Sequence, residues 1–178
     1  MANEKVIEIV IEKHEEALEM LSREIPEYVL TYDDIIAIHE AMIDRFGGAP
    51  GIRDHGLLEN VVNSPTQSVF GVDLYPSVYD KAAKYLFDFA HYQIFIDGNK
   101  RTGLACLGLF LEMNGYELNM TPEEEYEFTL DIANNRYNEV KDVAEVVKNH
   151  TSFLNHDTIV LDEQEMEEES SLDGLEEI

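Results

Sequence analysis

Cysteine is almost absent from this chain, and basic residues are scarce. The 178 residues include a single cysteine, Cys106, so no disulfide can form within the chain and a reducing compartment is expected. Lys and Arg total 12 against 38 Asp and Glu, which gives a formal net charge of −26. Such a charge argues against nucleic acid and anionic membranes as partners, because both repel a strongly acidic protein.

Long apolar runs are also missing. No run approaches the ~18 residues that a membrane-spanning helix needs, and the N-terminus lacks the basic-then-apolar pattern of a signal peptide. We therefore expect a cytoplasmic protein without a membrane segment. Hydrophobic residues still make up 44% of the chain, which suits one folded domain of this length.

The acidic residues are partly segregated at the C-terminus. From residue 157 onward there are ten acidic residues and no Lys or Arg. A segment of this composition cannot bury enough apolar surface to order itself, so 157–178 is predicted to be a disordered, solvating tail. The alternative is that the tail enters a cationic pocket as a phosphate mimic. Residues 1–156 are expected to form one helical domain with its core at 30–150.

Helical spacing of apolar residues predicts an all-α fold. An amphipathic helix is expected at 4–22, and further helices are expected to begin at Thr31, Asp54, Ser77 and Thr121, which are all good capping residues. An extended piece is expected at 69–72 and a last helix at 139–154. Nine consecutive nonpolar residues within 100–113 predict a central helix that is buried on nearly all sides.

The turn before this central helix has the composition of a phosphate site. The first turn of a helix leaves about four backbone N–H groups unpaired, and the helix dipole adds partial positive charge there. Gly98 allows close approach to the backbone, and Lys100 and Arg101 add two positive charges. An ordinary loop that caps a buried helix is the alternative interpretation.

Asp97 stands out, because an acid beside a phosphate site repels the ligand. A divalent cation between the two would remove the conflict, so Asp97 is predicted to bind Mg²⁺. Apart from His91, which is discussed below, the histidines show no paired metal-ligand spacing and are expected on helix faces or at the surface. They are His14, His39, His55, His150 and His156.

A second loop, at 47–54, is rich in glycine and ends in Arg53 and Asp54. We expect these two residues to form a local ion pair and a helix cap. The alternative is that the loop lines the phosphate site and positions a segment of a target protein.

The phosphate turn lies within a longer run, Phe95-x-Asp97-Gly98-Asn99-Lys100-Arg101-Thr102, and related stretches occur at 47–58, 75–76, 81–83 and 110–116. Together they resemble the Fic/Doc (Fido) family, on its Doc or death-on-curing side, over about residues 30–150. The resemblance implies an all-α fold and transfer of part of a nucleoside triphosphate to a protein hydroxyl. Most Fic members transfer AMP, whereas Doc phosphorylates a translation elongation factor and is neutralised by an antitoxin.

The resemblance also implies roles for individual residues. ATP would be the substrate nucleotide; Asp97 would hold Mg²⁺, Gly98 and Asn99 would shape the anion-binding turn, and Lys100 and Arg101 would contact the phosphates. Phe95 would anchor the loop in the core. AMP-transferring members carry glycine at the position of Lys100 and usually a second arginine at that of Leu104, so the present residues favour phosphate transfer.

The resemblance breaks at the head of the motif. The family has a histidine two residues before the phenylalanine, and this chain has Gln93 there. That histidine accepts a proton from the target hydroxyl, a role typically worth ~10²–10⁴-fold in rate, and glutamine has no useful basicity. We expect an impaired or inactive enzyme; the alternatives are a catalytically dead nucleotide- or protein-binding module and an AMP-transferring enzyme. His91 is a poor substitute base, because residues two apart on a helix face different directions.

Overall fold

The computed structural model describes residues 27–154, and it confirms the all-α prediction. The helices are α2 (Tyr32–Phe46), α3 (His55–Asn63), α4 (Val78–His91), α5 (Asn99–Met113), α6 (Pro122–Ala133), α7 (Val140–Asn149) and a short 3₁₀ turn, η1 (Ser64–Thr66). Short strands pair in two antiparallel two-stranded sheets: β1 (Ser68–Val69) with β2 (Val72–Asp73), and β3 (Tyr116–Leu118) with β4 (Thr151–Phe153). The predicted helix at 4–22 and the predicted tail at 157–178 lie outside the described residues.

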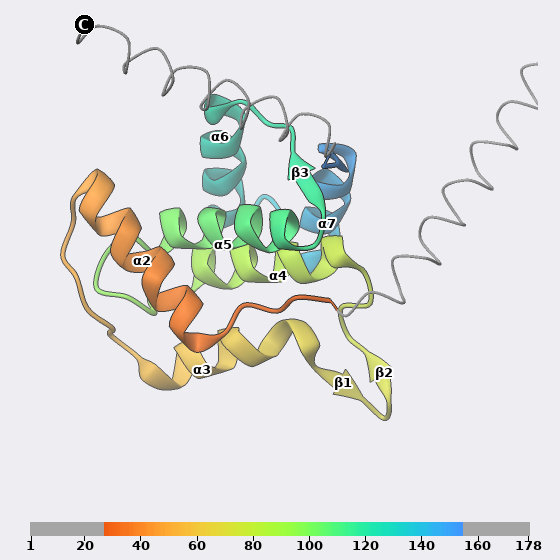
Figure 1. The fold of residues 1–178 in the computed structure, drawn as a ribbon, viewed down its shortest axis with the longest axis horizontal. Helices are drawn as coiled ribbons and strands as arrows, with labels where there is room; N and C mark the ends of the chain where they lie inside the picture. The colour runs from red at the N-terminus through yellow and green to blue at the C-terminus, as the bar shows by residue number, and fades with distance from the viewer. Residues whose placement is uncertain (1–26, 155–178) are drawn as a thin grey trace, which may run out of the picture.

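Helices α4 and α5 lie side by side at the centre of the molecule, with α2 and α3 toward one side and α6 and α7 toward the other (Figure 1). Tyr85 and Phe89 of α4 are fully buried, as are Leu107 and Phe110 of α5. The predicted central helix is therefore right, but α4 shares the centre with it. One face of α5 is only half-buried and is left to line a cavity.

Side-chain caps fix where the helices start. Thr31 begins α2 with a capping box, in which its backbone N–H donates to the Asp34 carboxylate over 2.8 Å. Equivalent boxes begin α4 at Ser77 and α6 at Thr121, and Asp54 caps α3. These four predicted starts are confirmed.

Two predicted segments differ from the structure. The extended piece at 69–72 is a hairpin, in which β1 and β2 are joined by Phe70 and Gly71 at positive φ. The last predicted helix ends at Asn149 instead of at 154, because the chain then pairs with β3 through Thr151–Phe153. The edge of β3 supplies backbone partners that helical spacing in the sequence does not reveal.

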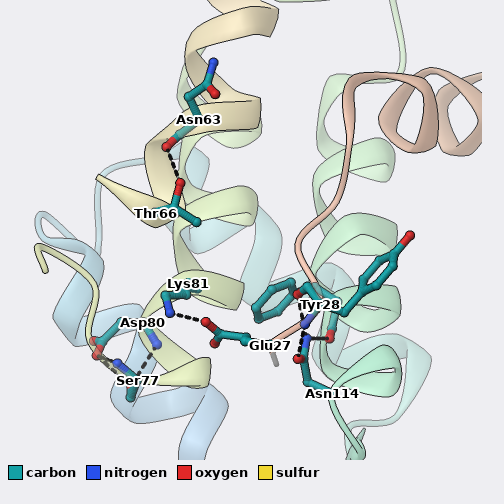
Figure 2. A network of polar contacts seen from close by, with 9 residues as sticks. Glu27, Tyr28, Asn63, Thr66, Ser77, Asp80, Lys81 and Asn114 are labelled. Atoms are coloured by element: carbon teal, nitrogen blue, oxygen red, sulfur yellow. Dashed lines mark hydrogen bonds and ion pairs between the residues drawn. The ribbon is translucent and has the colours of Figure 1, made fainter. Parts of the chain in front are cut away.

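The segment that leads into α2 is pinned against α4 and α5. The side-chain amide of Asn114, at the end of α5, accepts from the backbone N–H of Tyr28 over 2.9 Å and donates to its carbonyl over 3.0 Å (Figure 2). Lys81 in the first turn of α4 pairs with Glu27. These contacts fix the start of α2, which supplies one wall of the cavity described below.

Within residues 27–154, no helix combines the length and the apolar character needed to cross a membrane.

Candidate functional site

The loop between α4 and α5 is held in shape by Asn99. The oxygen of the Asn99 amide accepts from the backbone N–H of Ile94 over 3.0 Å and of Phe95 over 2.8 Å. Its nitrogen donates to the carbonyl of Phe95 over 3.0 Å. Because the amide is buried and makes three bonds to the loop backbone, Asn99 shapes the turn through its side chain.

Gly98 is the N-cap residue of α5 and has a φ of 77°, in the left-handed region that favours glycine. A side chain at this position would lie 3.2 Å from Cδ1 of Ile43 and 3.7 Å from an Arg101 nitrogen. The backbone N–H of Gly98 donates to the Asp97 carboxylate over 2.6 Å. The conformation thus needs glycine and turns the Asp97 carboxylate back over the start of the helix.

A cavity of about 800 Å³ opens at this turn. It brings together all the residues predicted for the site, which are Gln93, Asp97, Gly98, Asn99, Lys100 and Arg101. The other walls come from the C-terminal end of α2, from α5 and from α6: Met42, Arg45, Phe46, Leu104, Ala105, Gly108, Pro122, Glu125, Tyr126, Thr129 and Leu130, with Ile96 from the loop. Phe95 does not line the cavity and is fully buried, as expected of an anchor.

Three basic side chains line this cavity. Arg101 donates to the carbonyl of Gly47 over 2.9 Å, and another of its nitrogens lies 3.8 Å from the Asp97 carboxylate. The guanidinium groups of Arg45 and Arg101 lie 5.2 and 5.9 Å from the ring centre of Phe46. With Lys100, which is exposed, three of the 12 basic residues of a chain of net charge −26 line one cavity. This concentration suits an anionic ligand.

Sequence analysis missed the α2 and α6 walls. Arg45 and Phe46 directly precede the glycines that end α2, so their place could have been inferred from the neighbouring loop. Glu125 and Tyr126 carried no such signal, because an acid at the start of a helix is explained by the dipole alone. Burial raises the pKa of Glu125, which is half-buried in the wall of the cavity.

The loop at 47–54 runs beside the motif loop. Ile52 forms an isolated antiparallel bridge with Phe95, and the N–H of Ile96 donates to the carbonyl of Gly51 over 2.9 Å. Asp54 caps α3, as predicted, and the Arg53 guanidinium reaches the carbonyl of Ile96 at 3.4 Å. Arg53 and Asp54 do not form the predicted ion pair, because Arg53 contacts the Ile96 carbonyl instead. The loop packs against the motif loop, but none of residues 47–54 lines the cavity, and a role in positioning a target segment stays a prediction.

Two histidines, His91 and His39, lie in helices next to the motif loop but do not line the cavity. His91 lies in the last turn of α4, where its ring nitrogens lie 2.7 Å from the Phe87 carbonyl and 3.2 Å from the Asn135 amide oxygen. It does not line the cavity, so the structure gives it no role as a substitute base.

His39 was expected on a helix face or at the surface, but it is 3% exposed and its ring stacks on Phe95 of the motif loop. His39 does lie on a face of α2, as the prediction allowed, but that face is buried and not at the surface.

The residues of the turn fit Mg²⁺ only together with a phosphate ligand. Between residues 27 and 154, no group of three or more His, Cys, Asp or Glu side chains is placed to hold a metal ion. Mg²⁺ is commonly bound by one or two carboxylates, with water and substrate phosphates as the other ligands. Asp97 can supply such a carboxylate, because its side chain is 53% exposed and lines the cavity.

Comparison with known proteins agrees with this picture. A family described as the Fic/DOC family matches residues 29–111. The chain is 42% identical over 95 residues to the protein "Toxin Doc" of Mycolicibacterium smegmatis, covering 53% of this chain and 68% of that protein. It is 36% identical over 91 residues to "Protein kinase doc" of Escherichia phage P1, covering 51% of this chain and 71% of that protein. The chain belongs to the Fic/DOC family.

Proposed function

We propose that this chain is a Doc-type toxin whose cavity binds Mg²⁺ and ATP for transfer of the terminal phosphate to a protein hydroxyl. The proposal also holds that Gln93 leaves this chain impaired or inactive. The observation that carries it is the convergence of the whole predicted turn and three basic side chains on one cavity in a strongly acidic chain. It is supported by relatives whose names describe a toxin and a protein kinase.

The phosphates would lie at the start of α5. The first N–H groups of the helix have no partners within it, and Gly98 has no side chain to accept from them. Arg101 is held in place by its bond to the Gly47 carbonyl, so little side-chain freedom is lost on binding. Lys100 adds a charge on a flexible stem. Mg²⁺ bound to Asp97 would neutralise charge that develops on the phosphates.

The attacking hydroxyl would lie near Gln93, which lines the cavity at the start of the loop. In the transfer, the hydroxyl oxygen bonds to phosphorus, the bond to the leaving ADP oxygen breaks, and the hydroxyl proton must be accepted. The Gln93 amide can orient the hydroxyl by a hydrogen bond but cannot accept this proton. Without this base, we expect the rate of transfer to be ~10²–10⁴-fold lower.

Gln93 also favours a second candidate, a binding module that holds a nucleotide or a partner protein without turnover. Transfer of AMP is a further outcome that the same experiment detects. For the active form, the partners we propose are an antitoxin that covers the site and a translation factor as target, both in the cytoplasm.

The test compares the present chain with Gln93→His, using ATP labelled at the terminal or at the first phosphate and a cell lysate. We expect Gln93→His to transfer the terminal label to a protein at least ~10²-fold faster than the present chain. Gln67→His is the matched control, because Gln67 is exposed and lies outside the cavity. ATP binding without any gain in transfer would favour the binding module, and transfer of the first phosphate would identify AMP transfer.

A further inference from the structure

A stack of three rings passes beneath the motif loop. The ring of His39, on α2, lies parallel to Phe95 with the ring centres 3.7 Å apart and an angle of 2° between the planes. Phe95 in turn lies parallel to Phe89 of α4 at 5.8 Å. The loop residue is therefore held between one ring from each of two helices.

His39 also contacts the far side of the loop. Its Nδ1 lies 3.2 Å from the hydroxyl of Thr102, in the first turn of α5. The N–H of Thr102 donates to the carbonyl of Gly98 over 2.9 Å, and a side chain added at Gly98 would lie 3.6 Å from Cε1 of His39. The His39 ring therefore contacts Phe95, which precedes Asp97 in the loop, and Thr102, which follows Asp97 in the first turn of α5.

The second ring nitrogen of His39 makes this position unusual. Nε2 is buried without a hydrogen-bond partner, although buried polar atoms are nearly always paired. An apolar side chain would fill the same space without leaving a nitrogen unpaired. Burial lowers the pKa of His39, and the nearby Arg101 guanidinium lowers it further, so the ring is neutral at pH 7. What the histidine adds is the contact of Nδ1 with the Thr102 hydroxyl, together with the stacking of the ring face on Phe95.

We propose that His39 is a positioning residue of the nucleotide site. Its ring clamps Phe95 and Thr102, and thereby fixes the Asp97–Gly98 turn against the first N–H groups of α5. His39 does not line the cavity, so it acts through the loop and touches no substrate. This inference rests on the proposed function, because the turn is positioned for a bound nucleotide.

The test is calorimetric titration of the full chain with ATP, with and without Mg²⁺, for two variants that break the same contact. His39→Phe keeps the stacked ring and loses the bond to Thr102, whereas Thr102→Val loses the hydroxyl and keeps the shape. Each is expected to weaken Mg²⁺-dependent ATP binding about tenfold, as found when groups that orient ligands are removed. The double variant is expected to be no weaker than either single one, since both remove one contact.

A merely structural role would not move these readouts. Ile132→Val removes one buried methylene outside the cavity, and it should lower thermal stability without changing ATP affinity. Thr102→Ser keeps the hydroxyl and should bind ATP like the natural chain. Unchanged ATP affinity in His39→Phe and Thr102→Val, or additive losses in the double variant, would overturn the inference alone. Absence of ATP binding by the natural chain would overturn the proposed function and this inference with it.

Discussion

The neighbouring helices α4 and α5 begin in opposite ways. At the start of α4, the Ser77 hydroxyl accepts from the N–H of Asp80 over 3.1 Å, and the Asp80 carboxylate accepts from the N–H of Ser77 over 3.1 Å. At the start of α5, the N-cap residue is Gly98, which makes no side-chain cap. The capped start satisfies its own donors, whereas the uncapped start leaves them for a ligand.

The two kinds of helix start separate residues that stabilise the fold from residues that are proposed to bind the nucleotide. Helices α2, α4 and α6 all begin with a capping box and take no phosphate-binding role in the proposal. The first turns of both α5 and α6 line the cavity, but that of α6 is capped by Thr121 and acidic, whereas that of α5 is uncapped and carries Lys100 and Arg101. Substitutions at the two kinds of helix start should therefore separate effects on stability from effects on nucleotide binding.

The largest expected effect at the uncapped start comes from Asp97→Ala. Removing the only carboxylate in the turn should lower Mg²⁺-dependent ATP affinity by about 100-fold, the upper range for groups that support a metal site. The measurement is calorimetric titration with ATP in the presence and absence of Mg²⁺. Asp73→Ala, on the exposed hairpin, is the matched control and should bind like the natural chain. Equal affinities for Asp97→Ala and the natural chain would show that the metal assignment is wrong.

The next effect compares the two asparagines at the ends of α5. Asn99 makes three bonds to the motif loop, and Asn114 makes three to Tyr28 and Phe110. Replacing either by alanine should lower the free energy of unfolding by about 1–3 kcal/mol, because backbone groups lose their partners. Urea unfolding measures this loss.

ATP affinity should separate the two asparagine variants. Only Asn99→Ala releases the turn that holds Asp97, so only this variant is expected to bind ATP more weakly than the natural chain. Equal ATP affinities for folded Asn99→Ala and Asn114→Ala would contradict a role for the loop in binding.

Single substitutions at the two N-cap residues themselves have a smaller effect on stability. Ser77→Ala should lower the free energy of unfolding by about 1 kcal/mol through loss of the cap and leave ATP affinity unchanged. Gly98→Ala should lower it by a similar ~1–2 kcal/mol, because alanine is strained at positive φ, and should also weaken ATP binding. Urea unfolding and ATP titration of the same samples check both. Weaker ATP binding in Ser77→Ala would contradict the assignment of stability to the capped start and of binding to the uncapped start.

Much of this arrangement was visible in the sequence because its determinants are local. Capping boxes span four residues, so the starts at Thr31, Ser77 and Thr121 could be predicted. The turn that carries Asp97 and Arg101 is equally short. All the residues predicted from it do line one cavity.

The remainder of the site depends on packing between distant segments. Tyr126 joins the cavity because α6 packs across α5, and no short pattern reveals that. His39 looked like a residue on the face of a helix. Its burial depends on Phe95, which lies 56 positions later in the chain. The final strand was missed for the same reason, since its partner β3 lies far back along the chain.

The smallest expected effect is the pH dependence of stability contributed by His39. Burial, followed by the effect of Arg101, lowers its pKa below the usual 6.5, against the opposing influence of Glu40 and Asp97. The unfolded chain then binds a proton near pH 6.5 that the folded chain does not bind. The contribution is therefore complete above about pH 6.5 and is lost as the pH falls toward the lower, folded-state pKa. Urea unfolding between pH 5 and 8 should show a shallower fall in stability for His39→Phe than for the natural chain. Parallel curves for the two proteins would mean that the ring accepts a proton in the fold as readily as in the unfolded chain, and that burial beneath the loop does not keep it neutral.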